Sequence, residues 1–305
     1  MIMIPSLLNQ WYKARFRIGR MKRSFATSPE EVVLDIGSGD SPFAPADVIC
    51  EKFPWDDTER TQGFKHDRPL VAGDAEDLPF KDKAFDFIHC SHVLEHVYHP
   101  DRAIQELMRV GKRGYIEMPR SFLEKSVKST AGHFWFVNLT DGRLIFKPKA
   151  KGILDTEINS IHETILMDKD PLFSAFFYAR FYDLLNIGLF WKGNIPYSIE
   201  GDSRVAAVTS GENFEKATIE PEKGEKKAPP RFTVASVLKN VVRRRSAKKN
   251  FDLDALLACP TCKGSLDKKL AESIYVCRRC EVSYPMRGNI PILLRESAKP
   301  MVSLV

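Results

Sequence analysis

A short apolar run that ends at two glycines is the feature that most constrains how this chain folds. Residues 32–36 (VVLDI) are apolar except for Asp35, and Gly37-Ser38-Gly39 follows directly. An uninterrupted apolar run of this length is typical of a strand buried on both faces of a parallel sheet. Since glycine has no Cβ, the backbone after the strand can turn tightly and come close to a ligand. We therefore expect a buried parallel strand with a ligand site at its carboxyl end.

The residue five positions after the first glycine narrows the class of ligand. A dinucleotide-binding turn has a third glycine there, which packs the following helix and admits a pyrophosphate. The chain has Pro42 at that position. A pyrophosphate ligand is therefore disfavoured.

The next two predicted strands end in acidic residues. Residues 46–51 (ADVICE) form the second strand and finish at Glu51. In this architecture an acidic side chain at that strand end accepts hydrogen bonds from ribose hydroxyls, and Asp47 is less suited because it lies at the start of the strand. Residues 70–80 (LVAGDAEDLPF) supply a third strand and a Gly-Asp-Ala turn.

Residues 85–97 (FDFIHCSHVLEHV) add a fourth predicted strand. Together with the glycine turn and residues 70–80, they match the pattern G-D-A-x-x-L-P-F, F-D-x-I and H-V-L-E-H. This combination resembles the class I S-adenosylmethionine-dependent methyltransferases, in the broad family that includes ubiquinone- and menaquinone-type enzymes. The resemblance covers about residues 30–120. It implies an α/β, Rossmann-like fold with a mostly parallel sheet and S-adenosylmethionine as cofactor.

The resemblance also implies which residues form the site. Asp74 is expected near the adenine amino group, with the Ala75 backbone beside the ring. The full set expected at the cofactor is Asp35, Gly37, Ser38, Gly39, Glu51, Asp74, Ala75 and Ser91. His92 follows the fourth strand on the acceptor side, so we expect it to be the catalytic base for a hydroxyl acceptor.

The same stretch contains a competing motif. His92-Val93-Leu94-Glu95-His96 fits the H-x-x-E-H pattern of inverted zinc proteases. The pattern follows a buried strand inside an otherwise complete methyltransferase pattern, and the sequence indicates no third ligand. We therefore favour a role for Glu95 and His96 in satisfying a buried turn.

Residues 120–200 depart from the general family and are expected to supply acceptor specificity. Residues 132–146 alternate apolar and polar residues around an Asp-Gly pair, which predicts a hairpin. The aromatic run at 171–191 predicts a core helix, with a cap over the substrate as the alternative. His133 and His162 are secondary candidates for acceptor contacts.

Residues 211–230 are charged and almost free of apolar side chains, which is typical of a linker. A basic cluster follows at 243–249 (RRRSAKK). Solvated surface is the simpler interpretation, and contact with RNA or another anionic partner is the alternative. The net charge of +6 permits such a partner without requiring one.

Four of the six cysteines form two Cys-x-x-Cys pairs near the end of the chain. They are Cys259, Cys262, Cys277 and Cys280. Residues 263–276 separate the pairs, a spacing that predicts a closed, structural four-thiolate zinc site. A redox role is disfavoured because no thioredoxin-like unit surrounds the cysteines.

Residues 251–300 resemble the small zinc protein that activates tRNA, rRNA and release-factor methyltransferases. The resemblance rests on LLACPTCKG and on YPMRGNIPILL at 284–294. It implies a zinc-ribbon-like domain that acts in cis as a built-in activator. The apolar tail at 290–294 (IPILL) exceeds what so small a domain buries, which predicts a docking edge.

These patterns divide the 305 residues into four parts: a helical extension (1–28), a methyltransferase domain (29–210) that contains the specificity insert (120–200), a charged linker with the basic cluster (211–250) and a zinc module (251–305). No apolar stretch is long enough to span a membrane, and the N-terminus lacks the order of a secretory signal, so we expect a cytoplasmic protein.

The expected activity is methyl transfer from S-adenosylmethionine. The fourth strand lacks the Asn-Pro-Pro-Tyr motif that holds planar amino groups, so O-methylation is favoured over N-methylation. RNA, glycans and small hydroxylated or carboxylated metabolites remain open as acceptors. The alternative is a regulatory scaffold that binds RNA or a partner through the zinc module and the basic cluster.

Overall fold

The computed structural model describes residues 26–39, 42–56, 64, 66–126, 132–149, 160, 180–201 and 251–301. The predicted N-terminal helix, the charged linker, the basic cluster and His162 lie outside these residues. None of the helices within the described ranges is long and apolar enough to cross a membrane.

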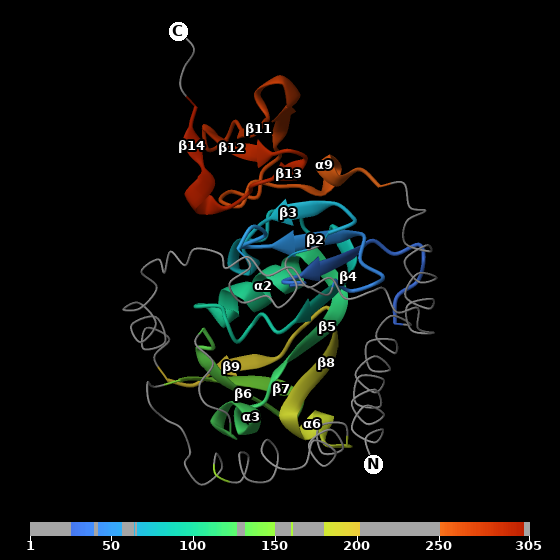
Figure 1. Ribbon diagram of the computed structural model, residues 1–305, viewed down its shortest axis with the longest axis vertical. Helices are drawn as coiled ribbons and strands as arrows, with labels where there is room; N and C mark the ends of the chain where they lie inside the picture. Colours follow the sequence, from blue (N-terminus) through green and yellow to red (C-terminus); the bar gives the residue numbers. More distant parts are fainter. Residues whose placement is uncertain are drawn as a thin grey trace, which may run out of the picture.

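A six-stranded sheet forms the centre of the molecule (Figure 1). Its strand order is β3-β2-β1-β4-β5-β8. The strands are β1 (Val33–Ile36), β2 (Val48–Glu51), β3 (Leu70–Ala72), β4 (Phe85–Ser91), β5 (Gly111–Pro119) and β8 (Asn186–Lys192). All neighbours are parallel except β5 and β8, which run antiparallel. This confirms the mostly parallel α/β fold. The chain order reverses between the neighbouring strands β1 and β4. Parallel sheets of this kind bind ligands at the carboxyl ends of the strands at such a switch point.

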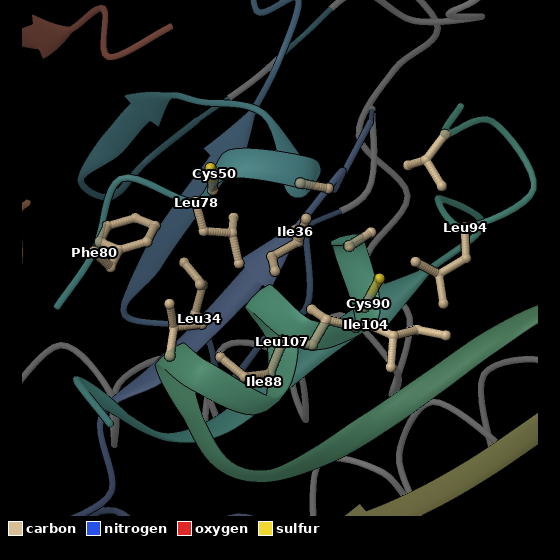
Figure 2. Packing of buried hydrophobic residues seen from close by; sticks show 14 of the residues in the cluster. Leu34, Ile36, Cys50, Leu78, Phe80, Ile88, Cys90, Leu94, Ile104 and Leu107 are labelled. Atoms are coloured by element: carbon tan, nitrogen blue, oxygen red, sulfur yellow. The ribbon is translucent and has the colours of Figure 1, made fainter. Parts of the chain in front are cut away.

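Helix α2 (Pro100–Val110) covers one face of this sheet. Apolar residues recur at helical spacing, and Ala103, Ile104, Leu107 and Val110 are all fully buried. Figure 2 shows Ile104 and Leu107 packed with Leu34 and Ile36 of β1 in one apolar layer. This packing holds the strands in position, and with them the loops at their carboxyl ends.

The insert builds a second, smaller sheet at the end of the molecule away from β3 (Figure 1). Strands β6 (Trp135–Thr140) and β7 (Arg143–Pro148) form the hairpin that the sequence predicts. Asp141 and Gly142 both have positive φ (49° and 74°), as a type I′ turn requires. Strand β9 (Tyr197–Ile199) pairs parallel to β7, and α3 (Ser121–Ser126) precedes the hairpin.

The aromatic run differs from the prediction of a core helix in the part that is described. Residues 171–179 lie outside the described ranges, α6 spans only Tyr182–Leu185, and the chain then forms β8. Strand β8 pairs with β5 over seven residues and completes the sheet edge. Ile187 and Trp191 are buried while Phe190 is 54% exposed, so the segment is a strand with one covered face.

The cysteine-containing module begins with α9 (Leu253–Leu256) and continues in short strands: β10 (Asp267–Lys269), β11 (Ile274–Cys277), β12 (Val282–Arg287), β13 (Ile290–Pro291) and β14 (Lys299–Pro300). Short 3-10 turns lie at Ala75–Asp77 (η1), Leu270–Glu272 (η3) and Arg295–Ser297 (η4). The module lies against β3, the free edge of the central sheet (Figure 1).

Backbone hydrogen bonds join the module to that edge. Leu293 N donates to Ala72 O at 2.8 Å, and Ala72 forms a parallel bridge with Ile292. On the other side of the edge, Ala258 N donates to Pro79 O at 2.9 Å. The apolar tail at 290–294 therefore pairs with the edge of β3 and extends the sheet. This is the docking role that the sequence predicts for it.

Candidate functional site

The glycine turn after β1 leaves room at the carboxyl edge of the sheet. Gly37 has φ +63°, and a Cβ on it would lie 2.4 Å from Val93 Cγ2. Gly39 has φ +54° and no atom within 4 Å of where its Cβ would be. Ser38 Oγ is buried and has no hydrogen-bond partner among the described residues. A tight turn, an open space and an unsatisfied hydroxyl fit a polar ligand held against the backbone, as S-adenosylmethionine requires.

Glu51 lies at the end of β2, beside this turn. Its Oε2 is 3.4 Å from Gly39 N, and its Oε1 is 3.5 Å from Phe53 N. Both contacts hold the carboxylate beside the glycine turn. Its role as the ribose acceptor stays a prediction.

Asp74 already has protein partners in this structure. Its Oδ1 accepts from Glu76 N at 2.9 Å and caps η1, while its Oδ2 pairs with Lys52 Nζ at 2.7 Å. Burial lowers the pKa of Lys52, but the Asp74 charge outweighs burial and holds it above its ordinary value. Asp74 thereby stabilises the turn that contains Ala75, which is a buried residue.

Asp35 points into the protein rather than to the solvent edge, since it is only 1% exposed. Its Oδ2 accepts from Phe43 N at 2.6 Å, and its Oδ1 lies 2.7 Å from His89 Nδ1. The His89 ring stacks on Phe43 with centroids 4.1 Å apart. Asp35 thus ties the loop after the glycine turn to β4. The sequence analysis missed His89, although a polar residue inside the apolar run 85–90 is a signal that could have found it.

His92 follows β4 in the left-handed conformation, with φ +57°. Such a backbone is uncommon outside glycine and concentrates at functional sites. Its Nδ1 lies 3.2 Å from Glu95 Oε1, and its Nε2 lies 3.9 Å from Glu117 Oε1. The imidazole is 45% exposed, whereas both carboxylates are buried. An accessible imidazole oriented by a buried carboxylate is the arrangement of a general base.

Glu117, at the end of β5, connects the other side chains of this region. It accepts from Ser91 Oγ at 3.2 Å and from Tyr115 Oη at 2.7 Å. Ser91 therefore has a protein partner, and its place beside the cofactor stays a prediction. The sequence analysis did not single out Glu117 or Tyr115, because nothing in the local sequence indicates which face of β5 they occupy.

The four module cysteines come together as the spacing predicts. Their Sγ atoms all lie within 4.8 Å of one another. Burial raises the pKa of Cys259, but hydrogen bonds with Tyr284, Cys262 and Thr261 outweigh burial and lower it to about 7. A thiol that ionises this readily suits a metal ligand. Four sulfurs from two knuckles fit a structural zinc ion, which would hold the module together.

A buried ionic group joins the module to the main domain. Glu106 of α2 accepts from Arg109 Nε and Nη2, both at 2.7 Å, and from Lys263 Nζ at 2.9 Å. Burial raises the pKa of Glu106, but these hydrogen bonds outweigh it and leave the pKa below its ordinary value. Arg109 also donates to the carbonyls of Leu78 and Phe80. The cluster therefore stabilises residues 78–80, which contact the module.

Comparisons with known proteins match the two parts of the chain to different relatives. The family model of the methyltransferase domain matches residues 54–116. A demethylmenaquinone methyltransferase of Renibacterium salmoninarum is 35% identical over 92 residues, which are 28% of this chain and 39% of that protein. The chain thus spans about two fifths of that relative's length.

A UPF0434 protein of Dechloromonas aromatica is 40% identical over 48 residues, which are 16% of this chain and 83% of that protein. Among solved structures, a S-adenosylmethionine-dependent methyltransferase of Thermotoga maritima matches with a TM-score of 0.29 and 22% identity. That match covers 39% of this chain and 62% of the other. The chain therefore joins a S-adenosylmethionine-dependent methyltransferase domain to a C-terminal module that belongs to the family of UPF0434 proteins.

Proposed function

We propose that the chain transfers the methyl group of S-adenosylmethionine to a hydroxyl acceptor, with His92 as the base. The observation that carries the proposal is the pairing of His92 Nδ1 with the buried Glu95 Oε1 at 3.2 Å, directly after β4. Bound cofactor would supply an electrophilic methyl group. The protein's own part is to align the acceptor and to take its proton.

The residues divide between the two tasks by position. Ser38, Gly39 and Glu51 lie at the ends of β1 and β2 and are assigned to the cofactor. His92 lies past β4 and is assigned to the acceptor. Glu95 accepts the Nδ1 proton, so that Nε2 keeps its lone pair for the acceptor hydroxyl. Glu117 lies near Nε2 and favours the imidazolium that forms when the proton is taken.

The relatives' names support one class of acceptor. They include the demethylmenaquinone methyltransferase above and a mitochondrial 2-methoxy-6-polyprenyl-1,4-benzoquinol methylase of Bos taurus, which is 44% identical over 55 residues. A quinol is a small hydroxylated ring, within the classes that the sequence leaves open. We propose a quinol-type acceptor ahead of RNA and glycans.

We further propose that the UPF0434 module stabilises the methyltransferase domain in cis. The support is the pairing of Leu293 with Ala72 and of Ala258 with Pro79, which covers a sheet edge that would otherwise expose backbone groups. Covering such an edge keeps a domain from associating through it.

The test of the activity uses the full chain with methyl-labelled S-adenosylmethionine and a reduced 1,4-naphthoquinol. His92→Ala should lower kcat while cofactor affinity stays nearly unchanged. The wild-type rate should fall as acid protonates the imidazole, and the variant should lose this acid limb. Normal turnover by His92→Ala would show that His92 is structural. A chain that binds no cofactor would instead favour the scaffold alternative.

A further inference from the structure

A second cluster of metal-ligating side chains lies beside His92, apart from the cysteines. Ligand atoms of Glu95, His96 and His133 all lie within 4.8 Å of one another. The first two follow β4, and His133 comes directly before β6 in the insert. The sequence analysis found no third ligand for the H-x-x-E-H motif, because His133 is remote in the sequence.

Glu95 has an unsatisfied charge in this cluster. The residue is 0% exposed, and its Oε2 has no hydrogen-bond partner within the described part of the chain. Its other oxygen pairs with His92. A buried carboxylate oxygen without a partner is costly, and such groups are normally hydrogen-bonded or bound to a cation. Oε2 is therefore placed to bind a cation.

Both histidines are oriented as metal ligands are. His96 Nδ1 lies 3.0 Å from Gly132 O, and His133 Nδ1 lies 2.7 Å from Glu124 Oε1. Both partners are acceptors, so each Nδ1 carries the proton and each Nε2 keeps its lone pair. A histidine held through its second nitrogen by a carbonyl or a carboxylate is the usual outer arrangement of a metal site.

We propose that Glu95, His96 and His133 bind a divalent transition-metal ion of the zinc or iron class. Two imidazoles and one carboxylate suit these ions and leave a coordination position for water. Tetrahedral ligand atoms about 2.0–2.2 Å from one ion lie about 3.3–3.6 Å apart, so the side chains need to close by no more than about 1.5 Å when the ion binds. The ion ties the insert to the end of β4. This goes beyond the proposed function, since methyl transfer with a histidine base needs no such ion.

The test is a Co²⁺ titration of the metal-stripped full chain, followed by visible absorption and calorimetry. Wild type should bind two equivalents, one with sulfur-to-cobalt charge transfer from the cysteines and one without it. Glu95→Gln and His133→Gln should each bind one equivalent and keep the charge-transfer band, which shows that the module is folded. His66→Ala changes an exposed histidine outside the cluster and should keep two.

Two further variants test the histidine cluster without changing its own ligands. The double change Cys259→Ser and Cys262→Ser removes half of the thiolates, and should remove the charge-transfer band and leave one equivalent at the histidine cluster. Glu124→Gln weakens the support of His133 and also removes the ion pair of Glu124 with Lys149, and it should weaken that equivalent by about 10–100-fold. The proposal is overturned if wild type binds a single equivalent, or if Glu95→Gln and His133→Gln retain both.

Discussion

The contact between Lys263 and Glu106 allows the docking of the UPF0434 module to be measured. The two atoms are 2.9 Å apart, and the side chains are 25% and 12% exposed. A hydrogen bond to a charged group contributes about 1.5–3 kcal/mol, but burial lowers the pKa of Lys263 and so opposes its charged form. Arg109 also keeps Glu106 paired when Lys263 is lost. We therefore expect a coupling of about 1–2 kcal/mol.

The assay is a double-mutant cycle of Lys263→Met and Glu106→Gln in the full chain. All tryptophans of the sequence (Trp11, Trp55, Trp135 and Trp191) lie outside the module. Because Trp55 stacks under Arg287 of the module, the cycle is measured in a Trp55→Phe background, where tryptophan fluorescence during urea unfolding reports the methyltransferase domain. A coupling seen by this probe shows that the module stabilises its neighbour. The cycle cancels the loss of the Arg109 contact, which occurs in both arms that carry Glu106→Gln.

The matched control is Arg278 with Asp267, which are 2.5 Å apart within the module and 78% and 45% exposed. A pair this exposed is screened by solvent and should couple far more weakly than Lys263 with Glu106, and its cycle should leave the tryptophan transition in place. A Lys263–Glu106 coupling no larger than this control would refute the reasoning that the module is docked through a buried ionic contact.

Three further predictions concern the same interface. Leu293→Ala removes a fully buried side chain and should destabilise the tryptophan transition by about 2–5 kcal/mol, whereas Leu270→Ala, at a residue 72% exposed, should change it little. The depressed pKa of Glu106 contributes stability above the ordinary glutamate pKa, and this is lost as the pH falls below about 4.5, so Glu106→Gln should flatten that acid limb of the urea midpoint. Cys259→Ser should release the module's metal and lower the melting temperature of the methyltransferase domain, measured by tryptophan fluorescence; an unchanged melting temperature would show that the domains are independent.

Local patterns predicted the elements that depend on local chemistry. The Asp141-Gly142 pair fixed the hairpin because its turn needs positive φ at both residues. The cysteine spacing likewise predicted a cluster of four sulfurs. In each case the residues that decide the structure are close together in the chain.

Contacts between distant segments could not be predicted in this way. Residues 186–191 form a strand because they pair antiparallel with the edge of β5, although their composition also suits a helix. His89 pairs with Asp35 across 54 positions, and the sequence gives no sign of that pairing. His133 likewise meets His96 only because the start of the hairpin pairs with the segment after β4, where Phe134 N donates to Glu95 O.

Calorimetric titration of the full chain with S-adenosylmethionine tests the central claim most directly. The account predicts one cofactor per chain, with the affinity of Glu51→Gln reduced because two ribose hydroxyls lose an ionised acceptor, a loss of about 1–3 kcal/mol. Asp47→Asn, at the start of β2, is the control and should bind as wild type does. Saturable binding that Glu51→Gln weakens would support the site described here. No binding by the folded wild-type chain, or equal binding by Glu51→Gln, would contradict it.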